Sequence, residues 1–246
     1  MRKACMALGL TLLAPAAYSA PLVDIYAGAY SWNAELSGTV SSGGDDISFD
    51  RDLDFDKTRE NVLYIGLEHP IPVLPNVRLR HSEISDSARN TLSRQISFGG
   101  ETFNVSDTVS SSYDLEMTDL TLYYSPLNNW VKLDLGLNVR RLEAEFNIAS
   151  TTESARESAS ETIPMLHLAA RGNLPFSGFY AGGEVNVVSY DGSKLQDTNV
   201  YLGWTSDFLL GVQVGYNRLD LELDDVSDLD SDFSLKGPYL ALTFTF

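Results

Sequence analysis

The chain has 246 residues, of which 34 are Asp or Glu and 17 are Lys or Arg, so its formal net charge at pH 7 is −17. Nucleic-acid binding needs a basic surface that neutralises phosphates, and so acidic a chain is not expected to have a nucleic-acid partner. No apolar run beyond residue 20 approaches the about 18 residues of a membrane-spanning helix, which excludes helical membrane spans.

The first 20 residues have the three parts of a secretory signal peptide. Arg2 and Lys3 form a basic start, residues 4–14 are an apolar stretch too short for a membrane span, and residues 16–20 supply small side chains for cleavage. Cleavage is expected after Ala20, with Ser19 as the other candidate. The predicted export signal is therefore the segment 1–20.

The remaining segment, 21–246, is predicted to form one domain. The only cysteine, Cys5, precedes the apolar stretch of the signal, so the exported domain would hold no disulfide. Its stability must then come from a closed, hydrogen-bonded structure.

Alternating apolar and polar residues predict ten strands in this domain, or eight if a segment such as 195–205 is not a separate strand. The strands are expected at 22–36, 58–70, 76–90, 112–125, 130–148, 161–174, 178–190, 195–205, 208–222 and 233–246. Four connections are short, and Pro and Asn recur there because they favour tight turns. The other five are polar and mostly longer: 37–57, 91–111, 149–160, 191–194 and 223–232. Such alternation of short turns and long loops is typical of outer-membrane barrels.

The segment 131–139 shows most clearly which side chains of a barrel strand would face lipid and which would face the interior. Its odd positions, from Val131 to Val139, are apolar, while the even positions are Lys, Asp, Gly and Asn. The apolar face suits lipid, where a Lys or Arg at mid-membrane costs about 2–4 kcal/mol. A soluble β-sandwich would show the same pattern in any single strand. Earlier in the chain the apolar parity switches between Met117 and Leu120, which predicts either a bulge or a strand that leaves the membrane.

Polar and charged residues on the opposite face are predicted to line the interior of the barrel. They are Glu68, Arg78, Arg80, Lys132, Asp134, Asn138, Arg140, Glu184, Asn186 and Gln213. One interpretation is a network of ion pairs and hydrogen bonds that fills a narrow barrel. The other is a pore whose wall charges select small solutes.

Acidic residues crowd the first and last loops, and their oxygens are ligands that Ca²⁺ or Mg²⁺ accepts. The segment 50–56 lacks the central glycine of an EF-hand loop, so solvated surface loops are the preferred interpretation and no metal site is assigned. The Ser-rich stretch 151–160 is expected to be a mobile polar loop. No cofactor motif and no convergent acid–base set accompanies His69, His81 or His167, so no catalytic residue is assigned and the protein is not expected to be an enzyme.

The end of the chain carries a resemblance to known proteins. Leu240, Leu242, Phe244 and Phe246 share one strand face, and this ending resembles the C-terminal signature of bacterial outer-membrane β-barrel proteins, which the barrel-assembly machinery reads. The motifs DLTLYY at 119–124, DLGL at 134–137 and KGPYLALTFTF at 236–246 are similar to an uncharacterised family of such barrels.

The resemblance implies an all-β, antiparallel up-and-down transmembrane barrel in the outer membrane of a Gram-negative bacterium. Expected partners are outer-membrane lipid, lipopolysaccharide and the assembly machinery. Three functions follow as hypotheses. The first is a narrow, porin-like pore for small solutes or ions, with cations favoured by the acidic loops. The second is a plugged structural or surface-interaction barrel that uses its long acidic loops. The third is an outer-membrane hydrolase, which is considered because the omptin proteases also have ten strands. It is less favoured than the other two.

Overall fold

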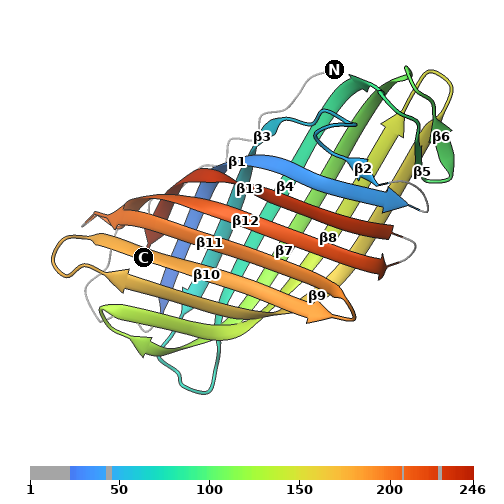
Figure 1. The fold of residues 1–246 in the computed structure, drawn as a ribbon. Helices are drawn as coiled ribbons and strands as arrows, with labels where there is room; N and C mark the ends of the chain where they lie inside the picture. Colours follow the sequence, from blue (N-terminus) through green and yellow to red (C-terminus); the bar gives the residue numbers. More distant parts are fainter. Residues whose placement is uncertain (1–22, 43–45, 207, 227–228) are drawn as a thin grey trace, which may run out of the picture.

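The computed structural model describes residues 23–42, 46–206, 208–226 and 229–246, so the predicted signal peptide at 1–20 lies outside the described residues. The described part contains thirteen strands (Figure 1). Their bounds are β1 Asp24–Ser42, β2 Ile47–Ser48, β3 Lys57–Glu68, β4 Asn76–Thr91, β5 Ile96–Phe98, β6 Glu101–Phe103, β7 Thr108–Asn128, β8 Val131–Ala149, β9 Ser154–Asn173, β10 Phe179–Tyr190, β11 Ser193–Thr205, β12 Leu210–Val226 and β13 Leu229–Thr245. None of the described residues belongs to a helix with the length and apolar character of a membrane span.

Ten of these strands, β1, β3, β4 and β7 to β13, form one antiparallel sheet that closes on itself through pairing of β13 with β1 (Figure 1). At the seam, Ile25 and Phe246 exchange two backbone hydrogen bonds of 2.9 and 2.7 Å. A closed sheet has no unpaired edge in the hydrocarbon, which is the condition for crossing a bilayer with strands. The prediction of an all-β, up-and-down ten-strand barrel is confirmed.

Of the five predicted polar connections, 149–160 and 223–232 are mostly strand, and the connection predicted at 191–194 is two residues shorter than expected. β8 ends at Ala149 and β9 begins at Ser154, so the stretch 151–160, predicted to be a mobile loop, is mostly strand. Likewise only residues 191–192 separate β10 from β11, and β12 runs to Val226 with β13 beginning at Leu229. In β9 the polar residues Ser154, Arg156, Ser158 and Ser160 are strand residues with exposed side chains. β-propensity depends on such context more than on residue type.

A belt of exposed apolar side chains surrounds the barrel near the end that carries the start of β1 and the end of β13. It includes Leu63, Ile65, Leu79, Leu120, Leu122, Leu135, Leu137, Leu166, Leu168, Val200, Leu202, Val212, Val214, Leu240 and Leu242. Outer-membrane barrels keep their short turns in the periplasm. The belt marks the part of the barrel wall that suits lipid, which we call the membrane half. By analogy with those barrels we call the opposite half the extracellular half.

The parity switch in β7 marks the boundary between these halves. The register of β7 with β8 is unbroken from Ser110 to Tyr124, so no bulge lies at the switch; the bulge lies between Tyr124 and Leu127. Met117 is buried inside the barrel, whereas Leu120 is exposed outside it. Of the two predicted explanations the bulge is wrong, and β7 leaves the lipid belt at this point.

Candidate functional site

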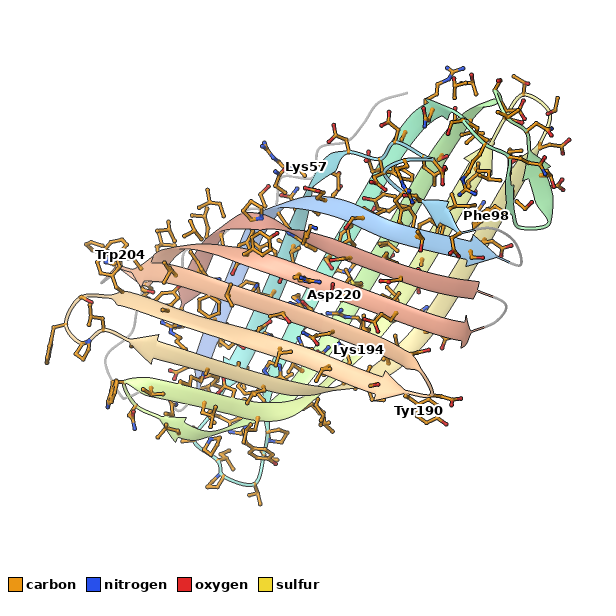
Figure 2. All side chains as sticks on the ribbon, in the orientation of Figure 1. Lys57, Phe98, Tyr190, Lys194, Trp204 and Asp220 are labelled. Carbon is orange, nitrogen blue, oxygen red and sulfur yellow. The ribbon has the colours of Figure 1, made fainter. Side chains whose placement is uncertain are left out.

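The inward side chains form three successive layers along the barrel. The first is the chamber, which opens at the end that carries the start of β1 and the end of β13. The second is the ion-pair layer above it, and the third is the apolar plug, which fills the extracellular half. Side chains project along the whole length of the barrel, and Trp204 and Phe98 mark its two ends (Figure 2).

The ion-pair layer consists of two arginines and two aspartates. Asp119 accepts hydrogen bonds from Arg80 Nε at 2.8 Å and from Arg140 Nε at 2.7 Å. Asp197 accepts from both arginines, at 2.5 Å for Arg140 Nη2. All four residues are buried. Buried charges are tolerated only where they are paired and hydrogen-bonded, and two cations here meet two anions.

The strand register explains how this layer forms. Arg80 and Asp119 are directly opposite each other on β4 and β7, and Asp119 is opposite Arg140 on β8. Asp197 lies on β11, with β9 and β10 between it and β8 in the sheet. The layer therefore ties one wall of the barrel to another. Asn138, also buried, donates to Asp119 Oδ1 at 3.1 Å and accepts from Thr121 at 2.8 Å.

The chamber lies between this layer and the periplasmic end. It is a cavity of about 240 Å³ lined by charged side chains and tyrosines. Arg78 pairs with Glu184 at 2.6 Å. Lys132 pairs with Glu68 and lies 3.7 Å from Asp134.

Five of the chamber's tyrosines lie directly opposite a glycine of the neighbouring strand. The pairs are Tyr26 with Gly66, Tyr64 with Gly28, Tyr180 with Gly203, Tyr201 with Gly182 and Tyr239 with Gly215. A Cβ at any of these glycines would come within 2.1–2.6 Å of the opposing tyrosine side chain. Only glycine permits such close approach, so the rings lie against the wall and leave the middle of the barrel open.

The structure places all ten predicted interior residues inside the barrel. Arg80, Asn138 and Arg140 belong to the ion-pair layer, whereas Glu68, Arg78, Lys132, Asp134, Glu184 and Gln213 line the chamber, and Asn186 is buried against His167, 2.8 Å away. The prediction missed Asp119, Asp197, His167 and the tyrosines. The alternation of the strands could have predicted the two aspartates. Leu120 and Leu122 after Asp119, and Val200 and Leu202 after Asp197, are apolar residues at even positions that point outward, so the odd positions point inward.

The apolar plug fills the extracellular half. Residues 47–55 of the first loop fold inward, and Phe49 packs against Phe55, Phe146 and Phe233 with ring centroids 5.8–6.3 Å apart. The β5–β6 hairpin adds Phe98, also buried. Tyr113, Leu115 and Met117 of β7 belong to the same core.

An ion pair holds the inserted loop. Arg94 contacts the buried Asp52 at 2.7 Å, and the backbone N–H of Ser48 donates to Asp52 at 2.9 Å. Burial alone raises the pKa of Asp52, but the hydrogen bonds from Arg94 and Ser48 outweigh it and hold the pKa below its ordinary value. Among the described residues no three His, Cys, Asp or Glu side chains gather as a metal site.

The three histidines lie apart from one another. His69 borders the turn after β3 and contacts the carbonyl of Pro75, His81 is exposed and contacts Thr118 at 3.0 Å, and His167 contacts Asn186. Within the described residues none of them bonds a carboxylate.

No protein-family model matches the sequence, and no curated protein matches it. Solved structures do match. The outer membrane protease OmpT from Escherichia coli overlays with a TM-score of 0.54 at 12% identity, covering 91% of this chain and 97% of that one. The attachment invasion locus protein Ail of Yersinia pestis, solved with the heparin analogue sucrose octasulfate, gives 0.42 at 10% identity over 91% and 98%. The toluene transporter TodX of Pseudomonas putida gives 0.31 at 7% identity over 92% and 90%.

The fold is that of bacterial outer-membrane β-barrel proteins. At such low identity the likeness defines the fold and leaves activity open.

Proposed function

We propose that the protein is a closed outer-membrane barrel that presents a β-structured surface outside the cell, and that it does not conduct solutes. The observation that carries this proposal is the burial of inward side chains at two successive levels. Arg140 is 1% exposed and Asp119 2% in the ion-pair layer, and Phe49 is 0% exposed in the plug. Side chains without accessible surface leave no water-filled path past them.

A narrow pore is the second candidate, and the chamber is the observation that favours it. Its charged wall is of the kind that selects ions or small solutes. The chamber ends, however, at the ion-pair layer, where Arg80 reaches both Asp119 and Asp197. Conduction would require this layer to open, which would separate buried charges.

The extracellular half offers the surface for interaction. Above the apolar belt its outer face carries exposed ion pairs, including Arg141 with Glu143 and Arg156 with Glu145. Exposed pairs contribute only about 0–1 kcal/mol to stability. Their groups are therefore available to lipopolysaccharide or to other surface partners at little cost to the fold.

Planar-bilayer recordings of purified protein test the proposal. We expect no stepwise conductance from the native protein, or from a variant in which a short Gly-Ser linker replaces residues 46–56, because the ion-pair layer remains. That linker combined with Arg80→Ser, Asp119→Ser, Arg140→Ser and Asp197→Ser should conduct if the protein still inserts. Stepwise conductance by the native protein would overturn the proposal. Loop deletions that alter surface binding without altering assembly would support it.

We further propose that residues 1–20 are a cleaved signal peptide and that Leu240, Leu242, Phe244 and Phe246 form an assembly signal. All four side chains are exposed on the outside of the barrel. Mass spectrometry of the outer-membrane form should give a chain that begins at Pro21. Phe246→Ser should lower the fraction that assembles, measured as the heat-modifiable band in gel electrophoresis; full assembly of that variant would contradict the assembly role.

A further inference from the structure

The chamber presents polar groups that its own contacts leave unused. The hydroxyls of Tyr64 and Tyr201 make no hydrogen bond to any described residue, although both line the chamber. Arg171 stacks on the ring of Tyr180, 3.7 Å from its centroid, and donates through Nε to Asn173 at 2.8 Å, which leaves its outer nitrogens without a described acceptor. Donors and acceptors that line an open cavity are available to a ligand.

Most of the other charges in the chamber have an opposite charge beside them. Arg78 is neutralised by Glu184, and Lys132 lies between Glu68 and Asp134. A ligand of high net charge would compete with these pairs. A neutral ligand that exchanges hydrogen bonds with their outer atoms would not.

The tyrosine faces supply the apolar part of the chamber. Tyr26, Tyr64 and Tyr201 lie over glycines of the adjacent strands and are only half-buried, so part of each ring remains exposed where it lines the chamber. The other two rings are covered, that of Tyr180 by Arg171 and that of Tyr239 by Tyr30. Flat apolar faces rimmed by hydroxyl, amide and charged groups complement a sugar ring, which has an apolar C–H face and a hydroxylated edge. Gln213 and Asn199 extend this rim, since Gln213 and Tyr239 bond at 2.6 Å and Tyr239 donates to Asn199 at 3.0 Å.

We propose that the chamber binds a neutral polyhydroxylated molecule of about one sugar ring, which enters from the periplasmic side. The volume of about 240 Å³ lies below the roughly 300–1,000 Å³ of pockets for drug-sized ligands, so a single ring is the size it accepts. A free monosaccharide and the terminal sugar of a glycan strand share this chemistry. This inference goes beyond the proposed function. Conductance tests the proposed function, whereas sugar binding tests this inference, and either result can occur without the other.

Saturation-transfer NMR of the full protein in nanodiscs tests the proposal with glucose, N-acetylglucosamine, short N-acetylglucosamine oligomers and, as a charged probe, gluconate. We expect saturable transfer to at least one neutral sugar. Equal affinity for monomer and oligomer would identify a free sugar, and preference for the oligomer would identify a glycan end. Absence of saturable binding by every neutral probe, or tighter binding of gluconate than of glucose, would overturn the proposal.

Two kinds of variant locate the site. Ala169 faces the chamber, and Ala169→Trp should fill it and weaken binding at least about tenfold, or 1.4 kcal/mol. Ala181 is exposed on the outside of the adjacent strand, and Ala181→Trp is the matched control, which should bind like the native protein. Tyr64→Phe and Tyr201→Phe, which keep the rings, should each weaken binding roughly two- to tenfold through loss of one hydrogen bond. Heat-modifiable migration verifies folding, and undiminished binding by a folded Ala169→Trp variant would exclude the chamber.

Discussion

The membrane half and the extracellular half of this barrel are built from the same strands, but apolar and polar side chains lie on opposite sides of the wall in the two halves. In the membrane half the outside is apolar and the inside holds charges and tyrosines, whereas in the extracellular half the outside is charged and the inside is an aromatic core. β7 shows both within one strand, since Met117 points inward and Leu120 points outward. Alternation along a strand therefore shows that two faces differ, and the surrounding solvent decides which of them is the inside.

The two halves must also be stabilised differently. Lipid tails are as apolar as the side chains that contact them. Contact of Leu120 with lipid therefore adds little hydrophobic free energy to the closure of the membrane half. Closure there depends on backbone hydrogen bonds and on the ion-pair layer. The extracellular half stands in water, where burial of Phe49 or Phe98 from the solvent supplies the usual hydrophobic stabilisation.

The largest effect is expected from breaking the ion-pair layer. Asp119→Ala leaves Arg80 and Arg140 buried with one anion fewer, and removal of one partner from a buried pair costs about 3–5 kcal/mol. Urea unfolding of the protein in lipid vesicles measures this change.

The control for that measurement is Glu143→Ala, which removes the partner of the exposed Arg141. We expect it to change the free energy of unfolding by less than about 1 kcal/mol. A similarly small effect of Asp119→Ala would mean that the layer does not hold the membrane half together.

A comparable but more local effect is expected from the apolar plug. Phe49→Ala removes a fully buried ring that contacts three others, and Phe→Ala in a core costs about 3–5 kcal/mol. The loss should appear as faster proteolysis within 46–56, while the membrane half keeps its heat-modifiable migration. Simultaneous loss of both would show that the two halves unfold as one unit.

The tyrosine–glycine pairs give a third, intermediate test. Gly203→Ala would bring a Cβ within 2.2 Å of the Tyr180 ring, and such overpacking costs about 1–3 kcal/mol. Gly172→Ala is the matched control, because no atom lies within 4 Å of the Cβ that it adds. If both variants unfold at the same urea concentration, the ring of Tyr180 is free to move and does not define the chamber.

Much of this architecture could be predicted from the sequence, because a barrel wall imposes a period of two. Parity placed Arg78, Lys132 and Glu184 inside, and the apolar odd positions between Val131 and Val139 outside. Parity cannot give partners across the barrel. Arg140 meets Asp197 only because of how the strands stagger on closure, which no local pattern records.

The extracellular half was harder to predict for a related reason. Residues 154–160 are mostly Ser and Ala with one Arg and one Glu, a composition that predicts a loop when lipid is assumed to lie outside the strand. The inward fold of residues 47–55 depends on contacts such as that between Asp52 and Arg94, 42 residues apart. The pattern of one strand holds no information about such a contact.

The smallest expected effect concerns that contact and depends on pH. The pKa of Asp52 is lowered in the folded protein, so its ion pair with Arg94 contributes stability above the unfolded pKa of about 4 and loses it as the pH falls through the lower folded pKa. We expect about 1 kcal/mol, because Arg94 is partly exposed to solvent.

Pepsin, which remains active in acid, should therefore cut residues 47–55 of the native protein increasingly below about pH 4. Asp52→Asn should be cut more readily at all pH values and with little further change in acid. Asp54→Asn, at an exposed position with φ of 61° that Asn also tolerates, is the control and corrects for the pH dependence of pepsin itself. If native and Asp52→Asn proteins respond to acid alike, another group controls the docking of this loop. The contrast between the two halves would then lie in their cores alone.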